Sequence, residues 1–338
     1  MDQNLTILRE IYKVLTAETV HESELAQTIK NYRNLLINLS PVNFSSEASE
    51  CDIHLANGKA IATAWAASCL DGAIRTQQFI RGISEAIKSL QTTKKRPIHI
   101  LYAGSGPFAT LILPILAVSS EAEIQVSLLE INAESFANVQ QVFSQLNFDT
   151  FVNTFANVDA TTYQIPNGES VDILVSETML HSLKEEPQVS IVINLMSQLR
   201  NDVILIPENI ILEIGFLHPK KITTEENFKK LATIFELKKE KLPDFKVTKL
   251  EGSQSVAFPK VTVNLPPEWL QHYHQLAIFT EIQVYQQYWI HTNENGLTTP
   301  LIIENTSQFE NTETAITLQY KIDSNPGIMY TFDSKKIS

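Results

Sequence analysis

Cysteine is scarce in this sequence, and long apolar runs are absent. The two cysteines, Cys51 and Cys69, cannot form a disulfide framework, which fits a reducing compartment. The longest apolar run, Ala109 to Val118, is too short to cross a bilayer and contains a proline. The first residues lack the continuous apolar core of a secretion signal. We therefore expect a cytoplasmic protein that does not act at a membrane.

Positive charge is also in short supply. Lysine and arginine number 26 against 38 acidic residues, so the formal net charge is −12. Such a surface repels nucleic acid unless its basic residues cluster, and only short basic runs are present. The eight histidines show no zinc-ligand spacing, so we expect no bound metal. The chain does have apolar residues, at 43%, which suffices for a sizeable core.

The pattern of apolar residues changes twice along the 338 residues, and this length suits two domains. Residues 1–60 are expected to be a helical N-terminal extension, since Leu8, Ile11 and Leu15 recur at helical spacing. An α/β domain is expected over residues 61–207. A mostly antiparallel β domain with a helical insertion over 224–241 is expected over residues 208–338.

Short apolar strands alternate with helices in the middle of the chain. The sequence predicts strands at 98–102, 126–130, 151–155, 171–176 and 203–206, and helices at 109–118, 133–146 and 187–200. This alternation predicts a parallel sheet covered by helices on both faces, in the Rossmann-like manner. Ligands of such sheets bind at the carboxyl ends of the strands, so functional residues should follow the strands directly.

A glycine-rich turn follows the first of these strands. Gly104, Ser105 and Gly106 precede Pro107, and Ala109 is small enough for a helix to pack closely on the sheet. Glu130 ends the next strand, where an acid can accept both hydroxyls of a ribose. An isolated Gly-x-Gly is weak evidence and could be an ordinary turn, but the combination predicts a nucleotide-type site.

An acid that binds the ribose hydroxyls, as expected of Glu130, suits both NAD and S-adenosylmethionine. Pro107 would be awkward in a pyrophosphate-binding turn, because proline has no backbone N–H to donate. Asp159, in the next connection, is placed to meet an adenine amino group, although a loop-capping role is an equal alternative for it. These two features favour S-adenosylmethionine as the cofactor.

Two acids in one connection indicate the chemistry of the acceptor. Glu177 ends the fourth predicted strand, and Glu186 lies nine residues further on, just before Pro187. Two carboxylates on one loop can hold a guanidinium through bidentate hydrogen bonds. The alternative for Glu186 is a plain helix N-terminus, where negative charge is favourable. For Glu177 that alternative is weaker, since an acid at a strand's carboxyl end faces the ligand crevice.

With these motifs in place, the region from about residue 60 to the end resembles the protein arginine methyltransferase family. The resemblance rests on the segment Leu70 to Thr76, on Tyr102 to Gly106, on the nine-residue step from Glu177 to Glu186, and on Leu205 to Asn209. It implies a Rossmann-like methyltransferase domain with a helical lid, followed by a β-barrel-like substrate domain. It implies Glu177 and Glu186 as catalytic residues, and as cofactor contacts Arg75, Ala103, Gly104, Ser105, Gly106, Glu130, Ile131, Val158, Asp159 and Glu177.

The sequence also departs from this family. Thr178 and Leu180 stand where an aromatic residue and a glycine normally follow the first glutamate. The Thr-His-Trp loop of the family is not recognisable near His291, and residues 1–60 have no counterpart. The predicted insertion at 224–241 takes the place of a dimerisation arm, so the resemblance suggests a possible homodimer.

Three functions remain open from the sequence. The first is N-methylation of an arginine or similar cation in a protein or peptide. The second is methylation of a small metabolite or natural-product precursor, which the altered substrate loop favours. The third is a binding partner that keeps the fold without catalysis. A fourth, NAD-dependent oxidoreduction, lacks a Tyr-x-x-x-Lys pair and a clear hydride-site histidine, although His181 could serve as a base.

Overall fold

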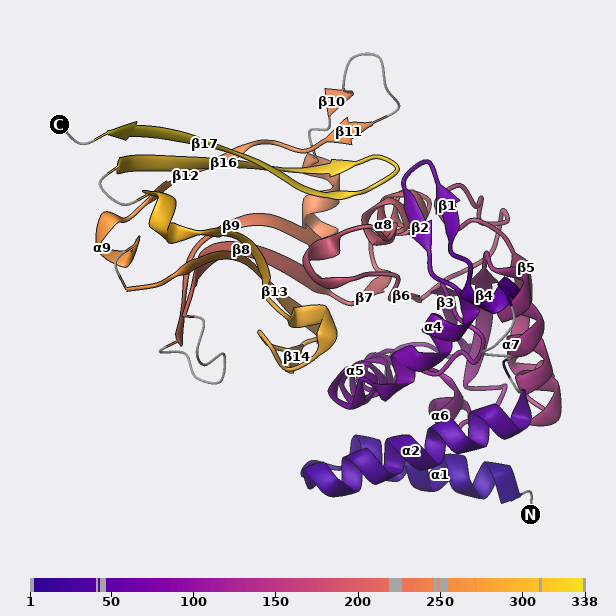
Figure 1. Cartoon of the computed structure of the whole chain (residues 1–338). Coiled ribbons are helices and arrows are strands. Elements are labelled where there is room, and N and C mark those ends of the chain that lie inside the picture. The colour runs from indigo at the N-terminus through magenta and orange to yellow at the C-terminus, as the bar shows by residue number, and fades with distance from the viewer. Residues whose placement is uncertain are drawn as a thin grey trace.

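The structure is a computed structural model in which N-terminal helices, a parallel-sheet domain and an antiparallel β domain follow one another along the chain (Figure 1). It describes residues 3–40, 42, 47–218, 227–245, 248–249, 255–270, 272–309 and 312–336. This order confirms the predicted fold class: a Rossmann-like domain followed by an antiparallel β domain, with helices at the N-terminus.

Two amphipathic helices open the chain and pack on the parallel-sheet domain. They are α1 (Gln3–Thr16) and α2 (Glu22–Leu39), and their apolar faces are buried. The Tyr32 hydroxyl of α2 donates a 2.7 Å hydrogen bond to the carbonyl of Thr110. Arg81 donates to the carbonyl of Leu15 at 2.9 Å. Both groups are thus satisfied by backbone far away in the sequence, so this pair of helices is part of the core.

The end of the expected helical extension is not helical. After the short helix α3 (Glu47–Glu50), a hairpin forms from β1 (Ile53–Leu55) and β2 (Gly58–Ala60). The helical spacing of the N-terminal extension thus ends with α2, and a short helix and a hairpin make up the connection that follows it. The helical segments that follow are α4 (Thr63–Ser68), η1 (Cys69–Asp71) and the long α5 (Ala73–Gln91).

Five parallel strands form the central sheet, in the order β5-β4-β3-β6-β7. The chain moves outward from β3 to one edge and then crosses back to β6, so the switch point lies between β3 and β6. In such sheets a ligand binds outside the carboxyl ends of the strands at this point. The strands are β3 (Ile98–Ala103), β4 (Ile124–Glu130), β5 (Val152–Asn157), β6 (Ile173–Ser176) and β7 (Ile204–Ile206).

The helices predicted at 109–118 and 187–200 are both shorter in the structure than expected. The helix predicted at 109–118 is reduced to α6 (Leu113–Leu116), because Ala109 adopts a left-handed conformation with φ of +48° and Pro114 falls in the first turn. The glycine turn therefore does not open directly into a helix. Helix α7 (Ala133–Gln145) is capped by the Asn132 side chain, and α8 (Gln188–Met196) begins directly after Pro187.

The β domain consists of two antiparallel five-stranded sheets that pack face to face (Figure 1). Phe235 of one sheet stacks on Tyr320 of the other, with ring centroids 4.5 Å apart, and Phe258 packs edge-on against both. One sheet contains β8 (Asn209–Leu217), β9 (Phe228–Lys238), β13 (Gln275–Tyr285), β14 (Tyr288–Ile290) and β15 (Leu301–Asn305). The other contains β10 (Thr248–Lys249), β11 (Val256–Ala257), β12 (Val261–Leu265), β16 (Thr312–Ile322) and β17 (Gly327–Lys336).

The helical insertion predicted at 224–241 is wrong within the described residues. Strand β9 pairs along its whole length with β8, and a 3₁₀ segment, η5 (Lys239–Asp244), follows it. Polar residues of good helix propensity gave the helical pattern, but pairing with a buried neighbouring strand overrides such propensity. Residues 224–226 lie outside the described residues. The possible homodimer, which relied partly on this insertion, stays a prediction.

A helix long and apolar enough to span a bilayer does not occur among the residues that the structure describes.

Candidate functional site

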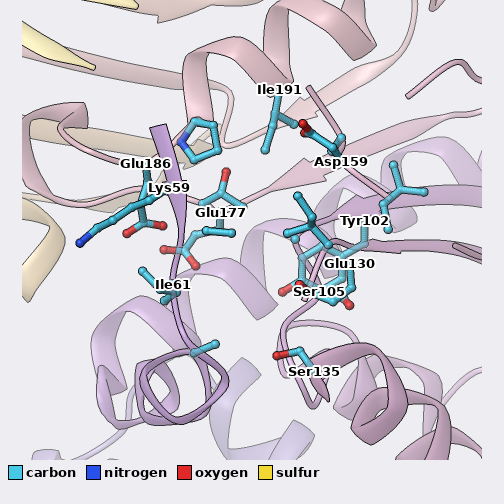
Figure 2. Close-up of a pocket in the computed structure, with 18 of the residues that line it drawn as sticks. Lys59, Ile61, Tyr102, Ser105, Glu130, Ser135, Asp159, Glu177, Glu186 and Ile191 are labelled. Atoms are coloured by element: carbon cyan, nitrogen blue, oxygen red, sulfur yellow. The ribbon is translucent and has the colours of Figure 1, made fainter. Parts of the chain in front are cut away.

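A pocket opens at the carboxyl ends of the parallel strands, next to the switch point. Its walls come from the glycine turn after β3, from the residues that end β4 and β6, and from the N-terminal hairpin. Figure 2 shows Glu130 and Ser105 at one end of this pocket and Glu177, Glu186 and Lys59 at the other.

Most of the residues selected from the sequence meet in this pocket. The lining includes Arg75, Gly104, Ser105, Glu130, Ile131, Val158, Asp159, Glu177 and Glu186. Two others are near it without lining it. Ala103 is the buried last residue of β3, and Gly106 faces Glu130 through its backbone N–H.

The glycine turn has a geometry that only glycine tolerates. Gly104 and Gly106 have φ of +75° and +62°, in the left-handed region that side chains rarely adopt. A Cβ atom on Gly104 would also overlap the side chain of Thr178, which follows β6. The turn after β3 and the loop after β6 are therefore in direct contact, so the two halves of the pocket are held together at this point.

Glu130 ties the turn to the end of β4. Its carboxylate accepts hydrogen bonds of 2.8 Å from the backbone N–H groups of Gly106 and Asn132. Burial raises the pKa of this carboxyl, and these backbone donors oppose the rise. A carboxylate has about four acceptor sites, so Glu130 keeps capacity for further donors from the pocket.

Asp159 makes the contact of a loop-capping residue. Its carboxylate accepts a 2.8 Å hydrogen bond from the N–H of Thr161, and it also lines the pocket. Both alternatives from the sequence, a cap and a ligand contact, are compatible with this position.

Arg75 and Glu177, both expected to contact the cofactor, form a buried ion pair. A second nitrogen of Arg75, Nη1, donates to the carbonyl of Cys69 at 2.8 Å. The Nε of Arg75 is buried and has no hydrogen-bond partner among the described residues. An unpaired buried donor is costly, so this nitrogen is a position where an acceptor group on a ligand would be stabilising.

Glu186 is a carboxyl group in an unusual environment. Only 5% of its surface is exposed, and burial raises its pKa from 4.5 to about 7, against the opposing effect of the nearby cations Arg75 and Lys59. A group with such a pKa exchanges protons near neutral pH, as is suitable for acid–base chemistry.

Residues 177–187, which link β6 to α8 and are called the acidic loop below, are held in a strained conformation. Ser182, Leu183 and Glu185 all have positive φ values, between +53° and +68°. Strained backbone of this kind persists only where the surroundings fix it.

The β domain and helix α8 supply those surroundings. The Ser182 N–H donates to the Thr280 hydroxyl at 2.9 Å, and the Tyr320 hydroxyl donates to the Leu183 carbonyl at 2.8 Å. Gln188, at the start of α8, accepts from the Thr178 N–H at 2.9 Å and donates to the Ser176 carbonyl. Contacts from both domains thus hold the acidic loop in place.

Sequence reasoning missed the contribution of the N-terminal hairpin. Leu55, Lys59 and Ala60 line the pocket, and so does Ile61 directly after β2. The available signal was the dipeptide Asn57-Gly58, which is typical of tight hairpin turns. Other lining residues carry no sequence signal of their own: Cys69, Thr110 and Ser135.

Within the described part of the chain, no group of three or more histidine, cysteine, aspartate or glutamate side chains is arranged to hold a metal ion.

Comparison with known proteins identifies the fold but gives no relative by sequence. No family model matches the chain, and no curated protein matches it. The solved structure of Arabidopsis thaliana protein arginine methyltransferase 10, in a uniquely open conformation, is similar at a TM-score of 0.52 and 10% identity. That match covers 78% of this chain and 95% of the other.

A chain of the Trypanosoma brucei PRMT1 enzyme–prozyme heterotetrameric complex with AdoHcy is similar at a TM-score of 0.49 and 12% identity. It covers 80% of this chain and 92% of that one. The likeness to the Arabidopsis structure shows that the chain has a protein arginine methyltransferase-like fold.

Proposed function

We propose that the protein is an S-adenosylmethionine-dependent methyltransferase that N-methylates an arginine or similar cationic group in a protein or peptide. The single observation that carries the proposal is the meeting of a glycine turn, Glu130, Arg75 and the two carboxylates Glu177 and Glu186 in one pocket at the switch point of the sheet.

The residues at the glycine-turn end fit the cofactor. The unpartnered Nε of Arg75 suits a carboxylate, such as the one on the methionyl part. Glu130 suits ribose hydroxyls, and Asp159 suits an adenine amino group.

The acidic loop would bind the acceptor. When bound, S-adenosylmethionine supplies a methyl group on a sulfonium, which becomes a neutral thioether after transfer. Glu177 and Glu186 would orient the acceptor nitrogen and stabilise its positive charge. The nitrogen gains a carbon and loses a proton, and Glu186 is the group whose pKa, about 7, suits it to accept that proton.

A small-molecule acceptor is the second candidate. The β1–β2 hairpin packs against the acidic loop, since the Lys59 N–H donates to the Glu185 carbonyl at 2.8 Å. The hairpin therefore adds a wall to the acceptor end of the pocket, and a walled pocket favours a compact acceptor.

Calorimetry and a labelled-methyl assay test the proposal together. We expect the full-length protein to bind S-adenosylmethionine and its demethylated product, and to transfer label to an arginine-containing peptide. Glu177→Gln should reduce transfer by about 100-fold or more while cofactor binding persists. Glu304→Gln, on strand β15 and outside the pocket, is the matched control.

The outcomes separate the alternatives. Transfer of the labelled methyl group to small amines but to no peptide would favour a methyltransferase that acts on a small metabolite. Binding of the cofactor without any methyl transfer would favour a binding partner that keeps the fold without catalysis. Absence of binding to either form of the cofactor would refute the proposed function altogether, as would unchanged transfer by Glu177→Gln.

A further inference from the structure

The N-terminal hairpin touches the acidic loop at the point where Glu186 lies. A Cβ atom on Gly58 would be 2.7 Å from the carbonyl oxygen of Glu185 and 3.2 Å from the nitrogen of Pro187. Gly58 also has a φ of +131°, which glycine alone adopts without strain. The hairpin is therefore in close backbone contact with the loop, and this contact is not part of any motif in the sequence.

Lys59 fixes this contact with its side chain. Its Nζ lies 3.0 Å from Oδ2 of Asp52 and 3.1 Å from Oε2 of Glu185. These two carboxylates raise the pKa of Lys59, and its hydrogen bond lowers the pKa of Glu185. The lysine side chain is three-quarters buried at the wall of the pocket, and its two carboxylate partners outweigh the effect of burial and keep it charged.

Glu186 depends on neighbouring cations to ionise. Among the described residues, none donates a hydrogen bond to its carboxylate. Two cations face it, Arg75 from α5 and Lys59 from β2, and both lower its pKa. Asp52 and Glu185 raise it. Two more groups complete the surroundings: Cys69 of η1, whose own pKa is affected by Glu186, and Glu177, which shares Arg75.

Arg75 is already engaged by Glu177, whereas Lys59 reaches the loop from the side of the hairpin (Figure 2). We propose that Lys59 is a positioning residue for the acceptor site: its ion pairs fasten the hairpin to the acidic loop and keep Glu186 available as a charged carboxylate. This inference rests on the proposed function, in which Glu186 holds the acceptor, and it adds the N-terminal segment to the machinery of that site.

Direct titration of Glu186 tests the proposal without any enzymatic assay. Carbon-13 NMR of the full chain with labelled glutamate carboxyl groups reports each titration, and Glu186→Gln identifies the signal. In the wild type we expect a midpoint at about pH 7. In Lys59→Met the midpoint should move upward by about half a pH unit or more, because one facing cation is lost.

Two further variants are matched controls. Lys59→Arg keeps the charge and should retain the wild-type midpoint. Lys184→Met removes a lysine that is also next to Glu185, with Nζ 3.4 Å from Oε1, but that does not line the pocket, and it should leave the midpoint unchanged. If Lys59→Met fails to fold, Lys59→Gln replaces it. If the titration midpoint of Glu186 is unchanged in Lys59→Met or its substitute Lys59→Gln, the proposal is overturned. An equal shift of this midpoint in Lys184→Met would overturn it too.

The same variants give a second readout if methyl transfer is found. For Lys59→Met, the acidic limb of kcat/KM should move to higher pH and KM for the peptide should rise at least about 5-fold, with kcat less affected. Lys59→Arg should restore both. If the titration shifts but no methyl is transferred to any acceptor, the proposed function fails and the link from Lys59 to Glu186 stands. If transfer occurs but the titration does not shift, the link fails and the proposed function stands.

Discussion

Three buried carboxylates lie in the pocket, and each is satisfied in a different way. Backbone N–H groups hold Glu130 and a guanidinium holds Glu177, whereas Glu186 accepts no hydrogen bond from the described residues and is stabilised only by the charges of the nearby cations Arg75 and Lys59. Burial therefore disfavours the charged form of Glu186 with little compensation, and this raises the pKa of Glu186. Such a cost at one residue is typical of a site that serves function and not stability.

This cost predicts a stabilising substitution at Glu186. Its pKa is 4.5 ordinarily and about 7 in the folded protein, so the folded state binds the proton more tightly. The free energy of unfolding of the wild type should fall as pH rises between these values. At about pH 8, Glu186→Gln should be more stable than the wild type by at most about 3 kcal/mol, and the difference should disappear below about pH 4. Urea unfolding across this range measures it.

Glu185 is the matched control for that measurement, because its pKa is shifted in the opposite direction. The hydrogen bond from Lys59 lowers it, so this carboxylate stabilises the fold above its ordinary pKa, and the contribution is lost as pH falls. Glu185→Gln should therefore reduce stability at neutral pH. Equal effects of the two substitutions, or a Glu186→Gln protein less stable than the wild type at about pH 8, would contradict the assignment.

At the scale of elements, helix α2 supports one segment of the pocket lining. The Tyr32 ring is fully buried, and its hydroxyl donates to the carbonyl of Thr110, a residue of the pocket lining. The segment from Gly104 to Ile112 is largely non-helical, so its carbonyls need partners from outside. Helix α2 thus holds the segment that follows the glycine turn.

Removing this hydroxyl tests the role of α2. In Tyr32→Phe the Thr110 carbonyl loses a donor inside the core, and we expect the free energy of unfolding to fall by about 1 to 3 kcal/mol. Tyr12→Phe on α1 is the control, because the Tyr12 ring is only partly buried and its hydroxyl makes no hydrogen bond with the described residues. Chemical denaturation compares the two. Equal losses would mean that the Thr110 contact contributes nothing specific.

At the scale of the whole molecule, the acidic loop depends on the β domain. Tyr320 crosses from strand β16 to the Leu183 carbonyl, Thr280 of β13 accepts from Ser182, and the Pro326 carbonyl accepts from the Glu185 N–H. The left-handed conformations of the loop are fixed by these contacts. The residues proposed for the acceptor are therefore positioned by a domain whose described residues contribute no side chain to the pocket lining.

Loosening one of these contacts should affect the loop more than the cofactor end. In Tyr320→Phe the buried Leu183 carbonyl is left without its donor, and we expect faster amide hydrogen exchange over the acidic loop, by about 10-fold or more. Cofactor affinity measured by calorimetry should stay within about 2-fold. Tyr330→Phe is the control, because the Tyr330 hydroxyl donates to the Ile303 carbonyl and makes no hydrogen bond to the loop. The same exchange pattern in both variants would contradict this dependence.

Short-range patterns in the sequence predicted the parts of the fold that local physics specifies. The strand before Gly104, the acids after β4 and β6, and the amphipathic helices α1 and α2 were all identifiable, because burial imposes a period on the residues that form them. The errors were the helices predicted at 109–118 and 224–241. A positive φ at Ala109 overrode local propensity in the first, and pairing of β9 with the buried strand β8 overrode it in the second.

The sequence by itself determined which residues are available at the carboxyl ends of the parallel strands, since strand order and turn residues fix that edge. Only the tertiary structure decided that Arg75 pairs with Glu177, that Lys59 reaches the acidic loop, and that Tyr320 holds it. These contacts join residues about 100 or more positions apart, and a local pattern contains no information about such distances. Their geometry follows from the packing of the hairpin, the parallel sheet and the β domain against one another.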